Sequence, residues 1–178
     1  KISHEEGVPN LYEYKRHYLL SLCHEKIEGG SRRGVIGMPL TLGMYELLPM
    51  WTAVFSSLGF EVVSSGMSSK AIYEKGQFTI PSDTACYPAK IMHGHIEKLC
   101  EMGCDTIFYP RLTWNLDEKF YNMPSGDNHY NCPVVAYYPE VLAGNCPELT
   151  GTKFIYDYLG IHNRPAFEKR MEEILNRE

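Results

Sequence analysis

The sequence lacks the features that mark membrane and nucleic-acid-binding proteins. No apolar run approaches the ~20 residues that span a bilayer, and no signal peptide is recognisable. Lysine and arginine do not cluster beyond Arg32-Arg33, and the formal net charge of -5 argues against a nucleic-acid surface. We therefore expect no membrane and no nucleic acid among the partners of this chain.

The common nucleotide-binding and hydrolase motifs are also missing. Gly34-Val35-Ile36-Gly37 is not the G-x-G-x-x-G of a dinucleotide site, and neither a P-loop nor a G-x-S-x-G elbow occurs. No cluster of histidine and carboxylate residues has the spacing of a mononuclear metal site. A thiol–imidazole pair of Cys86 with His93 is disfavoured, because the two lie roughly 10 Å apart along a predicted helix. His95 shares the apolar face of that helix, which is more typical of a core histidine.

Six cysteines are present, yet their pattern does not indicate disulfides. They are widely spread, none forms C-x-x-C, and a chain of 178 residues can fold on its own hydrophobic core. We therefore expect reduced thiols and a cytoplasmic location, with most of the cysteines serving as small buried side chains. The chain begins at Lys1 rather than at a methionine, so we expect a fragment of a longer protein.

Strand and helix patterns alternate along the chain. Short apolar runs predict strands over 34–39, 60–64, 105–110 and 133–138, and apolar faces at helical spacing predict helices over 9–23, 44–58, 68–76, 86–102 and 165–176. Alternation of this kind predicts an α/β fold: a mainly parallel, Rossmann-like sheet of about four strands in the order 2-1-3-4, flanked by helices. We expect a single domain over 1–178, with a helical extension over 1–33 and a core over 34–145.

The predicted core is the set of apolar residues that these elements turn inward. It comprises Val35, Ile36, Trp51, Val54, Phe55, Val62, Val63, Ile96, Leu99, Ile107, Phe108, Val134 and Val135.

Two cysteines lie where ligands usually gather in α/β proteins. Cys86 comes where an extended stretch turns into a helix, and Pro88 suits the first turn of that helix. Unpaired backbone N–H groups and the positive helix end favour the thiolate there. Cys132 follows a polar turn and opens the predicted fourth strand. We expect both thiols at the carboxyl edge of the sheet beneath the polar loop 111–131, although Cys132, before its strand, reaches that edge only if the strand is short or antiparallel.

Several continuous segments resemble one known family. They are Ile36-Gly37-Met38-Pro39, the stretch from Phe55 to Val63, the stretch from Ile80 to His95 with its Cys86-Tyr87-Pro88-Ala89-Lys90 motif, and the stretch from Asp127 to Val135 with its Asn131-Cys132-Pro133 motif. Together they look like the uncharacterised domain attached to activators of 2-hydroxyacyl-CoA dehydratases, found mainly in anaerobes. The likeness runs from about Pro9 to Asn145. That domain is in turn similar to the cluster-binding subunits of the dehydratases.

The resemblance implies a redox role. In the related systems an ATP-hydrolysing activator reduces a partner that carries a [4Fe-4S] cluster, and this chain, which has no ATP-binding motif, resembles the acceptor side. Cys86 and Cys132 match positions that would be cluster ligands. Family members often have a third cysteine where this chain has Arg111, so Cys146 or another chain would supply the third thiolate. Arg111 could instead neutralise a thiolate or bind an acyl-CoA phosphate.

Two further residues on the Cys86 helix, Lys90 and His93, are also candidates for lining such a site. The expected partners are other domains of a longer activase protein or a dehydratase-like subunit. Two functions therefore compete: an electron-transfer or cluster-binding domain that serves a CoA-linked reductive enzyme, and a cofactor-free regulatory or interaction domain. A small-molecule-binding domain at the sheet edge is a third, weaker interpretation.

Overall fold

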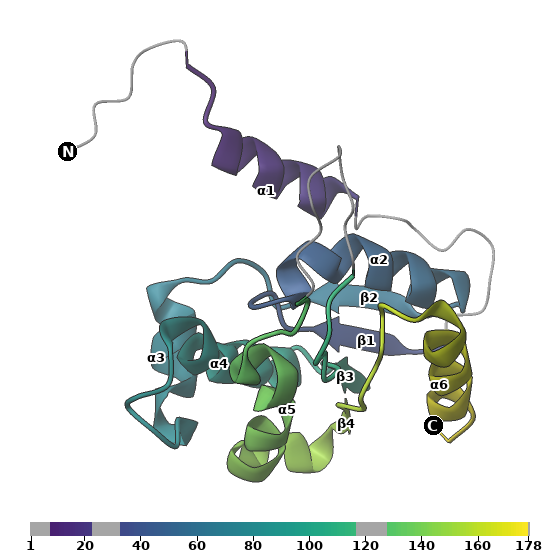
Figure 1. Cartoon of the computed structure of the whole chain (residues 1–178). Helices are drawn as coiled ribbons and strands as arrows, with labels where there is room; N and C mark the ends of the chain where they lie inside the picture. Colours follow the sequence, from purple (N-terminus) through teal and green to yellow (C-terminus); the bar gives the residue numbers. More distant parts are fainter. Residues whose placement is uncertain (1–7, 23–32, 117–127, 178) are drawn as a thin grey trace.

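A parallel four-stranded sheet forms the centre of the molecule (Figure 1). The computed structural model describes residues 8–22, 33–116 and 128–177. The strands are β1 (Val35–Met38), β2 (Glu61–Ser64), β3 (Thr106–Phe108) and β4 (Lys153–Ile155), and their order is β2-β1-β3-β4. Every pairing between neighbours is parallel. The predicted α/β class and the strand order 2-1-3-4 are confirmed.

Helices cover both faces of the sheet. On one face lie α2 (Met44–Ser57) and α6 (Arg164–Arg177). There the Trp51 ring packs edge-on against Phe108, with ring centroids 4.8 Å apart, and at a tilt against Phe167, with centroids 5.9 Å apart. The other face carries α4 (Tyr87–Glu101), which packs on Gly37 through Leu99. Beside α4 lie α3 (Lys70–Gly76) and α5 (Pro133–Asn145). Two short 3-10 segments, Gln77–Thr79 and Pro147–Gly151, complete these connections.

The predicted fourth strand over 133–138 is wrong, because this segment begins helix α5. Its β-branched start, Val134-Val135, suggests a strand, but the residues that α5 buries include Ala136, Pro139 and Leu142, a helical spacing. The actual β4 lies further along the chain and pairs with β3. The sheet and its core therefore extend past residue 145 to α6.

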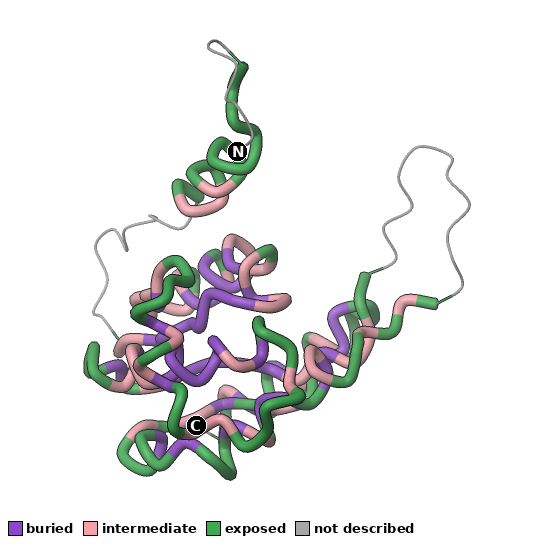
Figure 2. Tube along the Cα trace, turned by 90° about the vertical axis from the view of Figure 1, so that its left-hand side faces the viewer, coloured by how far each residue is buried: buried purple, intermediate pink, exposed green. Residues whose placement is uncertain are grey.

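The N-terminal helix α1 (Leu11–Ser21) lies at the periphery and contacts this core through its partly buried Leu20. The Asn10 side chain caps it by accepting hydrogen bonds from two backbone N–H groups of the first turn. None of its residues is buried, as the absence of purple on its tube shows (Figure 2). An ion pair between Lys15 and Glu46, 2.7 Å apart, links it to α2. Within the described part of the chain, no helix is long and apolar enough to cross a membrane.

The interior agrees with most of the predicted core. Seven of the thirteen residues named above are buried: Ile36, Trp51, Phe55, Ile96, Leu99, Ile107 and Phe108. The other six, all valines, are partly exposed. Five of these six still pack against the buried cluster, and Val135 is the exception. The centre of the core is therefore aromatic and sits between the sheet and α2.

Candidate functional site

The carboxyl edge of the sheet collects the starts of three long helices. Each of α2, α4 and α5 leads from the carboxyl end of one strand back to the amino end of the next, so each begins at this edge. The connections from β1 and β3 run to opposite sides, which makes the β1–β3 pair the switch point of the sheet. The starts of α2 and α5 lie close together there: a Cβ atom placed on Gly43, the N-cap of α2, would be 3.7 Å from Cγ1 of Val135 in the first turn of α5.

Cys86 and Cys132 are the N-cap residues of α4 and α5. Their backbones are nearly identical, with φ/ψ of -63/154° at Cys86 and -62/156° at Cys132, and a proline stands in the first turn of each helix. Both side chains are exposed free thiols that make no capping hydrogen bond. Since Cys132 opens a helix rather than a strand, it reaches the carboxyl edge without a short or antiparallel fourth strand.

Tyr109 joins the two cysteines at this edge. It directly follows β3, is 3% exposed, and its hydroxyl has no hydrogen-bond partner among the residues that the structure describes. Burial raises the pKa of Tyr109, and the neighbouring Tyr138, Cys132 and Cys86 side chains raise it further. Tyr109 therefore stands at the same edge of the sheet as the two thiols. A buried hydroxyl without a hydrogen-bond partner lowers the stability of the fold by about 1–3 kcal/mol. The unpaired Tyr109 hydroxyl is therefore unusual and needs an explanation.

Hydrogen bonds from Asn131 hold the start of α5 beside the extension of β3. The Asn131 side-chain amide donates to the Leu112 carbonyl oxygen at 2.8 Å, and its backbone N–H donates to the Thr113 carbonyl oxygen at 2.9 Å. One residue before, Tyr130 forms an antiparallel bridge with Trp114, and their rings meet at 4.0 Å. The described arms of the 111–131 loop therefore pair with each other and fix the position of Cys132.

Cys146 is not brought to this site. It follows α5, whereas Cys132 precedes it, and a helix of 13 residues separates the two by about 20 Å. The Cys146 side chain is buried 3.4 Å from Nδ1 of His93, and burial raises its pKa to about 11. Within the described residues, no group of three or more His, Cys, Asp and Glu side chains could hold a metal ion.

His93 is a structural link between α4 and α5. Its Nε2 lies 2.9 Å from the Tyr138 hydroxyl, and its Nδ1 lies 2.8 Å from Oγ1 of Thr79. Because the Thr79 hydroxyl donates to the Gly76 carbonyl oxygen at 3.0 Å, we assign the ring proton to Nδ1, so that Nε2 accepts from Tyr138. Burial lowers the pKa of His93 to about 4. Lys90, the remaining candidate on α4, is half-buried one turn after Cys86.

A second buried histidine holds the loops that follow β1 and β2, a role the sequence did not predict. Ser65 Oγ accepts from the Leu40 backbone N–H at 2.8 Å and meets Nδ1 of His95 at 2.6 Å. Nε2 of His95 meets the Ser68 hydroxyl at 2.9 Å. Burial, with a smaller contribution from Lys98, lowers the pKa of His95 to about 4. The neutral imidazole therefore fixes the carboxyl ends of two strands.

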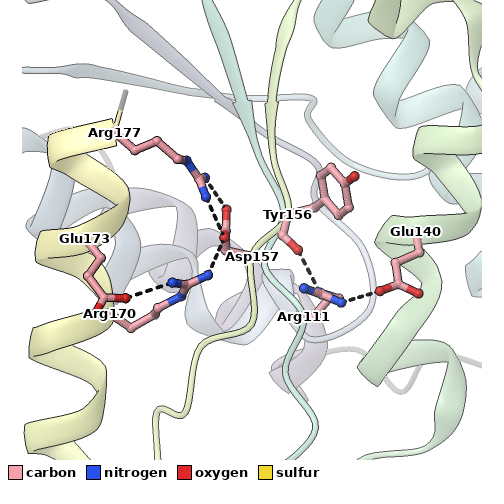
Figure 3. Close-up of polar contacts among 7 residues, drawn as sticks. All are labelled: Arg111, Glu140, Tyr156, Asp157, Arg170, Glu173 and Arg177. Carbon is pink, nitrogen blue, oxygen red and sulfur yellow. Dashed lines mark hydrogen bonds and ion pairs between the residues drawn. The ribbon is translucent and has the colours of Figure 1, made fainter.

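Arg111 is already paired within the protein (Figure 3). Its guanidinium forms an ion pair with Glu140 of α5, and its Nε donates to the Tyr156 carbonyl oxygen at 3.0 Å. Its charge is thus offset by a carboxylate rather than directed at a thiolate or a phosphate. Arg111 stands beside a surface pocket of about 320 Å³ that also contains Asp157 and Arg177.

Asp157 gathers the basic residues of α6 next to this pocket. It accepts hydrogen bonds from Arg170 at 2.8 Å and from Arg177 at 2.6 Å, and Arg170 also pairs with Glu173 (Figure 3). The Arg177 hydrogen bond is the main cause that lowers the pKa of Asp157. This charge-balanced cluster fastens α6 to the end of β4 and offers no unpaired cation to a ligand in the region described.

Comparison with known proteins places the chain in a family. The family model described as the CoA enzyme activase uncharacterised domain matches residues 35–177. No curated protein and no solved structure matches the chain. The matched segment begins with β1 and ends in α6, so it includes the entire sheet and the two thiols at its edge. The chain belongs to the family of the CoA enzyme activase uncharacterised domain.

Proposed function

We propose that this domain holds a [4Fe-4S] cluster through Cys86 and Cys132 and takes part in low-potential electron transfer to a CoA-linked dehydratase or reductase. The observation that carries the proposal is the pair of exposed free thiols at the starts of α4 and α5, at the sheet edge where Tyr109 follows β3. Membership of a CoA enzyme activase family supports the association with a CoA-linked enzyme.

The residues present fit two ligand positions of such a cluster. Iron–sulfur clusters are bound by cysteine thiolates, and the positive start of a helix attracts the negative charge that thiolates carry. The buried phenol without a partner fits a site that receives a further group. Clusters of this kind are usually held by four cysteine thiolates, so the remaining ligands would come from a partner chain.

When bound, the cluster would supply reversible one-electron transfer at low potential. The residues of this chain hold and orient it: the two thiolates provide ligands, and the His93–Tyr138 hydrogen bond keeps their helices at a fixed spacing. We expect the electron to come from an ATP-hydrolysing activator domain of a longer activase protein and to pass to a dehydratase-like subunit. We expect this domain to work in the cytoplasm of an anaerobe.

Anaerobic reconstitution with iron and sulfide tests the proposal. The wild-type chain should become brown and bind iron and sulfide, and Cys86→Ala and Cys132→Ala should each lose most of both. Cys100→Ala is the matched control, because Cys100 lies about 20 Å from Cys86 at the other end of the same 15-residue helix. Equal iron content in wild type and in both site variants would reject the assigned ligands.

The competing function is that of a cofactor-free regulatory or interaction domain. It predicts a colourless protein that takes up no iron under the same conditions, and it predicts that the folded domain alters the activity of its activator without carrying an electron. Half-buried and exposed tyrosines near Cys86, among them the stacked pair Tyr73 and Tyr87 with rings 5.5 Å apart, would suit a contact surface in that case.

A further inference from the structure

Three buried side-chain polar atoms lack a hydrogen-bond partner within the described chain, and one of them belongs to a residue at the sheet edge where the candidate site lies. Trp51 Nε1 and Thr52 Oγ1 belong to α2, in the core between that helix and the sheet. The third atom is the hydroxyl of Tyr109, which directly follows β3 at the edge where α4 and α5 begin. Its surroundings therefore differ from those of the two core atoms.

This hydroxyl has no hydrogen-bond partner inside the described fold, whereas the hydroxyl of a second buried tyrosine, Tyr138, has one. The Tyr138 hydroxyl donates to His93 at 2.9 Å, and the Tyr109 side chain, 3% exposed, has no such acceptor in the described residues. A phenol, whose ordinary pKa is about 10, keeps its proton at neutral pH. The group is therefore a hydrogen-bond donor that awaits an acceptor.

We propose that the Tyr109 hydroxyl donates a hydrogen bond to a sulfur of the cluster held by Cys86 and Cys132, and thereby raises the reduction potential of that cluster. This inference rests on the proposed function. A hydrogen bond to sulfur stabilises the extra negative charge that reduction adds, and such bonds are among the factors that set cluster potentials. Tyr109 is thus a tuning residue and not a ligand.

Tyr109→Phe in the reconstituted chain tests the inference, because it removes only the hydroxyl. Iron and sulfide contents should match those of wild type, since both thiolates remain. The midpoint potential, measured by anaerobic redox titration, should become more negative by about 59 mV, which corresponds to a tenfold smaller equilibrium constant for one-electron reduction. Tyr137→Phe, which removes an exposed phenol from the same end of the molecule, should leave the potential unchanged.

Unfolding of the apoprotein gives a second readout that does not depend on the cluster. Tyr109→Phe should leave the apoprotein as stable as wild type or more stable, because it removes an unsatisfied buried group. Tyr138→Phe should lower the stability, because it deprives His93 of a partner. A destabilised Tyr109→Phe apoprotein would show that the hydroxyl has an internal partner and would overturn the inference.

The outcomes separate the inference from the function on which it rests. Iron binding by wild type with an unchanged potential in Tyr109→Phe overturns the inference alone. Failure of wild type to bind iron overturns the proposed function, and the inference with it. A more negative potential at full iron content supports both.

Discussion

The Nε2 atom of His93 lies 2.9 Å from the Tyr138 hydroxyl, and this hydrogen bond joins α4 to α5 about two turns below the cysteine that caps each helix. Cys86 and Cys132 come from distant parts of the chain, so their relative position depends on contacts between the two helices. The His93–Tyr138 bond is buried and lies closest in sequence to both caps among the α4–α5 hydrogen bonds described. It therefore links core packing directly to the geometry of the candidate site.

Removing the Tyr138 hydroxyl should destabilise the protein. Tyr138→Phe leaves the buried Nε2 of His93 without a donor, which should lower the free energy of unfolding by about 1–3 kcal/mol. Chemical denaturation followed by fluorescence measures the change. Tyr137→Phe, at the exposed neighbouring position, should stay within about 0.5 kcal/mol of wild type. Equal stability of the two variants would mean that the His93–Tyr138 bond contributes nothing.

The two buried histidines should make the protein sensitive to mild acid. The folded state lowers the pKa values of His93 and His95 from 6.5 to about 4. Above pH 6.5 both histidines are neutral in either state and the shift has no effect. As the pH falls from 6.5 towards 4, the unfolded chain binds protons that the folded chain does not, so stability is lost, by about 3 kcal/mol per histidine at most.

Denaturation curves recorded between pH 7.5 and about 4 check this dependence. His93→Gln should make the loss over this range smaller, whatever its effect at pH 7.5. His17→Gln is the control, since His17 is exposed on α1. The explanation fails if stability is flat over this range, or if the His93 variant retains the full slope.

Local patterns predicted the first three strands and five of the helices, because each has a clear beginning and end. Ser69 caps α3, Cys86 precedes a helix with proline in its first turn, and Gly59, with φ of 85°, follows α2. The strand order 2-1-3-4 was also predicted correctly, and right-handed crossovers explain why α2 lies on one face of this sheet and α4 and α5 on the other. This order holds for whichever segment forms the strand after β3, so the error over 133–138 did not change it.

The remaining errors have physical reasons. β4 is three residues long, Lys153-Phe154-Ile155, too short to show a period. Pro88 predicted the helix start at Cys86, whereas Cys132, although Pro133 follows it, was wrongly placed at the start of a strand. The role of Tyr109 could not be predicted at all. Its isolation depends on which groups surround it in space, and neighbours from distant elements leave no mark in a local pattern. The hydrogen bond between His95 and Ser65 likewise joins distant elements and could not be predicted from a local pattern.

Alanine substitution of two helical glycines, Gly94 and Gly144, should change the stability of the protein in opposite directions. A Cβ at Gly94 of α4 would lie 1.7 Å from the Ile72 carbonyl oxygen of α3, so Gly94→Ala must push the two helices apart. We expect a loss of about 3 kcal/mol or more. A Cβ at Gly144 of α5 meets nothing within 4 Å, and Gly144→Ala should be neutral or stabilising by up to about 1 kcal/mol.

Chemical denaturation of both variants checks this contrast. The α3–α4 crossing also includes Gly76, where a Cβ would lie 2.1 Å from the Gly94 nitrogen, so Gly76→Ala should resemble Gly94→Ala. A Gly94→Ala protein of wild-type stability would show that the two helices separate easily. In that case the position of Cys86 at the start of α4 would be less constrained than the packing indicates.

The Asp157 cluster should hold α6 on the sheet by charge as well as by packing. Asp157→Asn weakens the hydrogen bonds with Arg170 and Arg177, and the side chain is only 13% exposed, so we expect a loss of about 1–3 kcal/mol. Glu173→Gln is the control, because its pair with Arg170 lies on the surface and should contribute less than about 0.5 kcal/mol.

The contribution of Asp157 should also depend on pH. The Arg177 hydrogen bond lowers the pKa of Asp157 below 3.8, so this stabilisation is fully present above that pH and is lost as the pH falls through the lowered value. Denaturation midpoints at pH 7 and in strong acid measure this stabilisation. The difference in stability between wild type and Asp157→Asn should become smaller in acid. An equal difference at both pH values would show that the carboxylate charge does not hold the helix on the sheet.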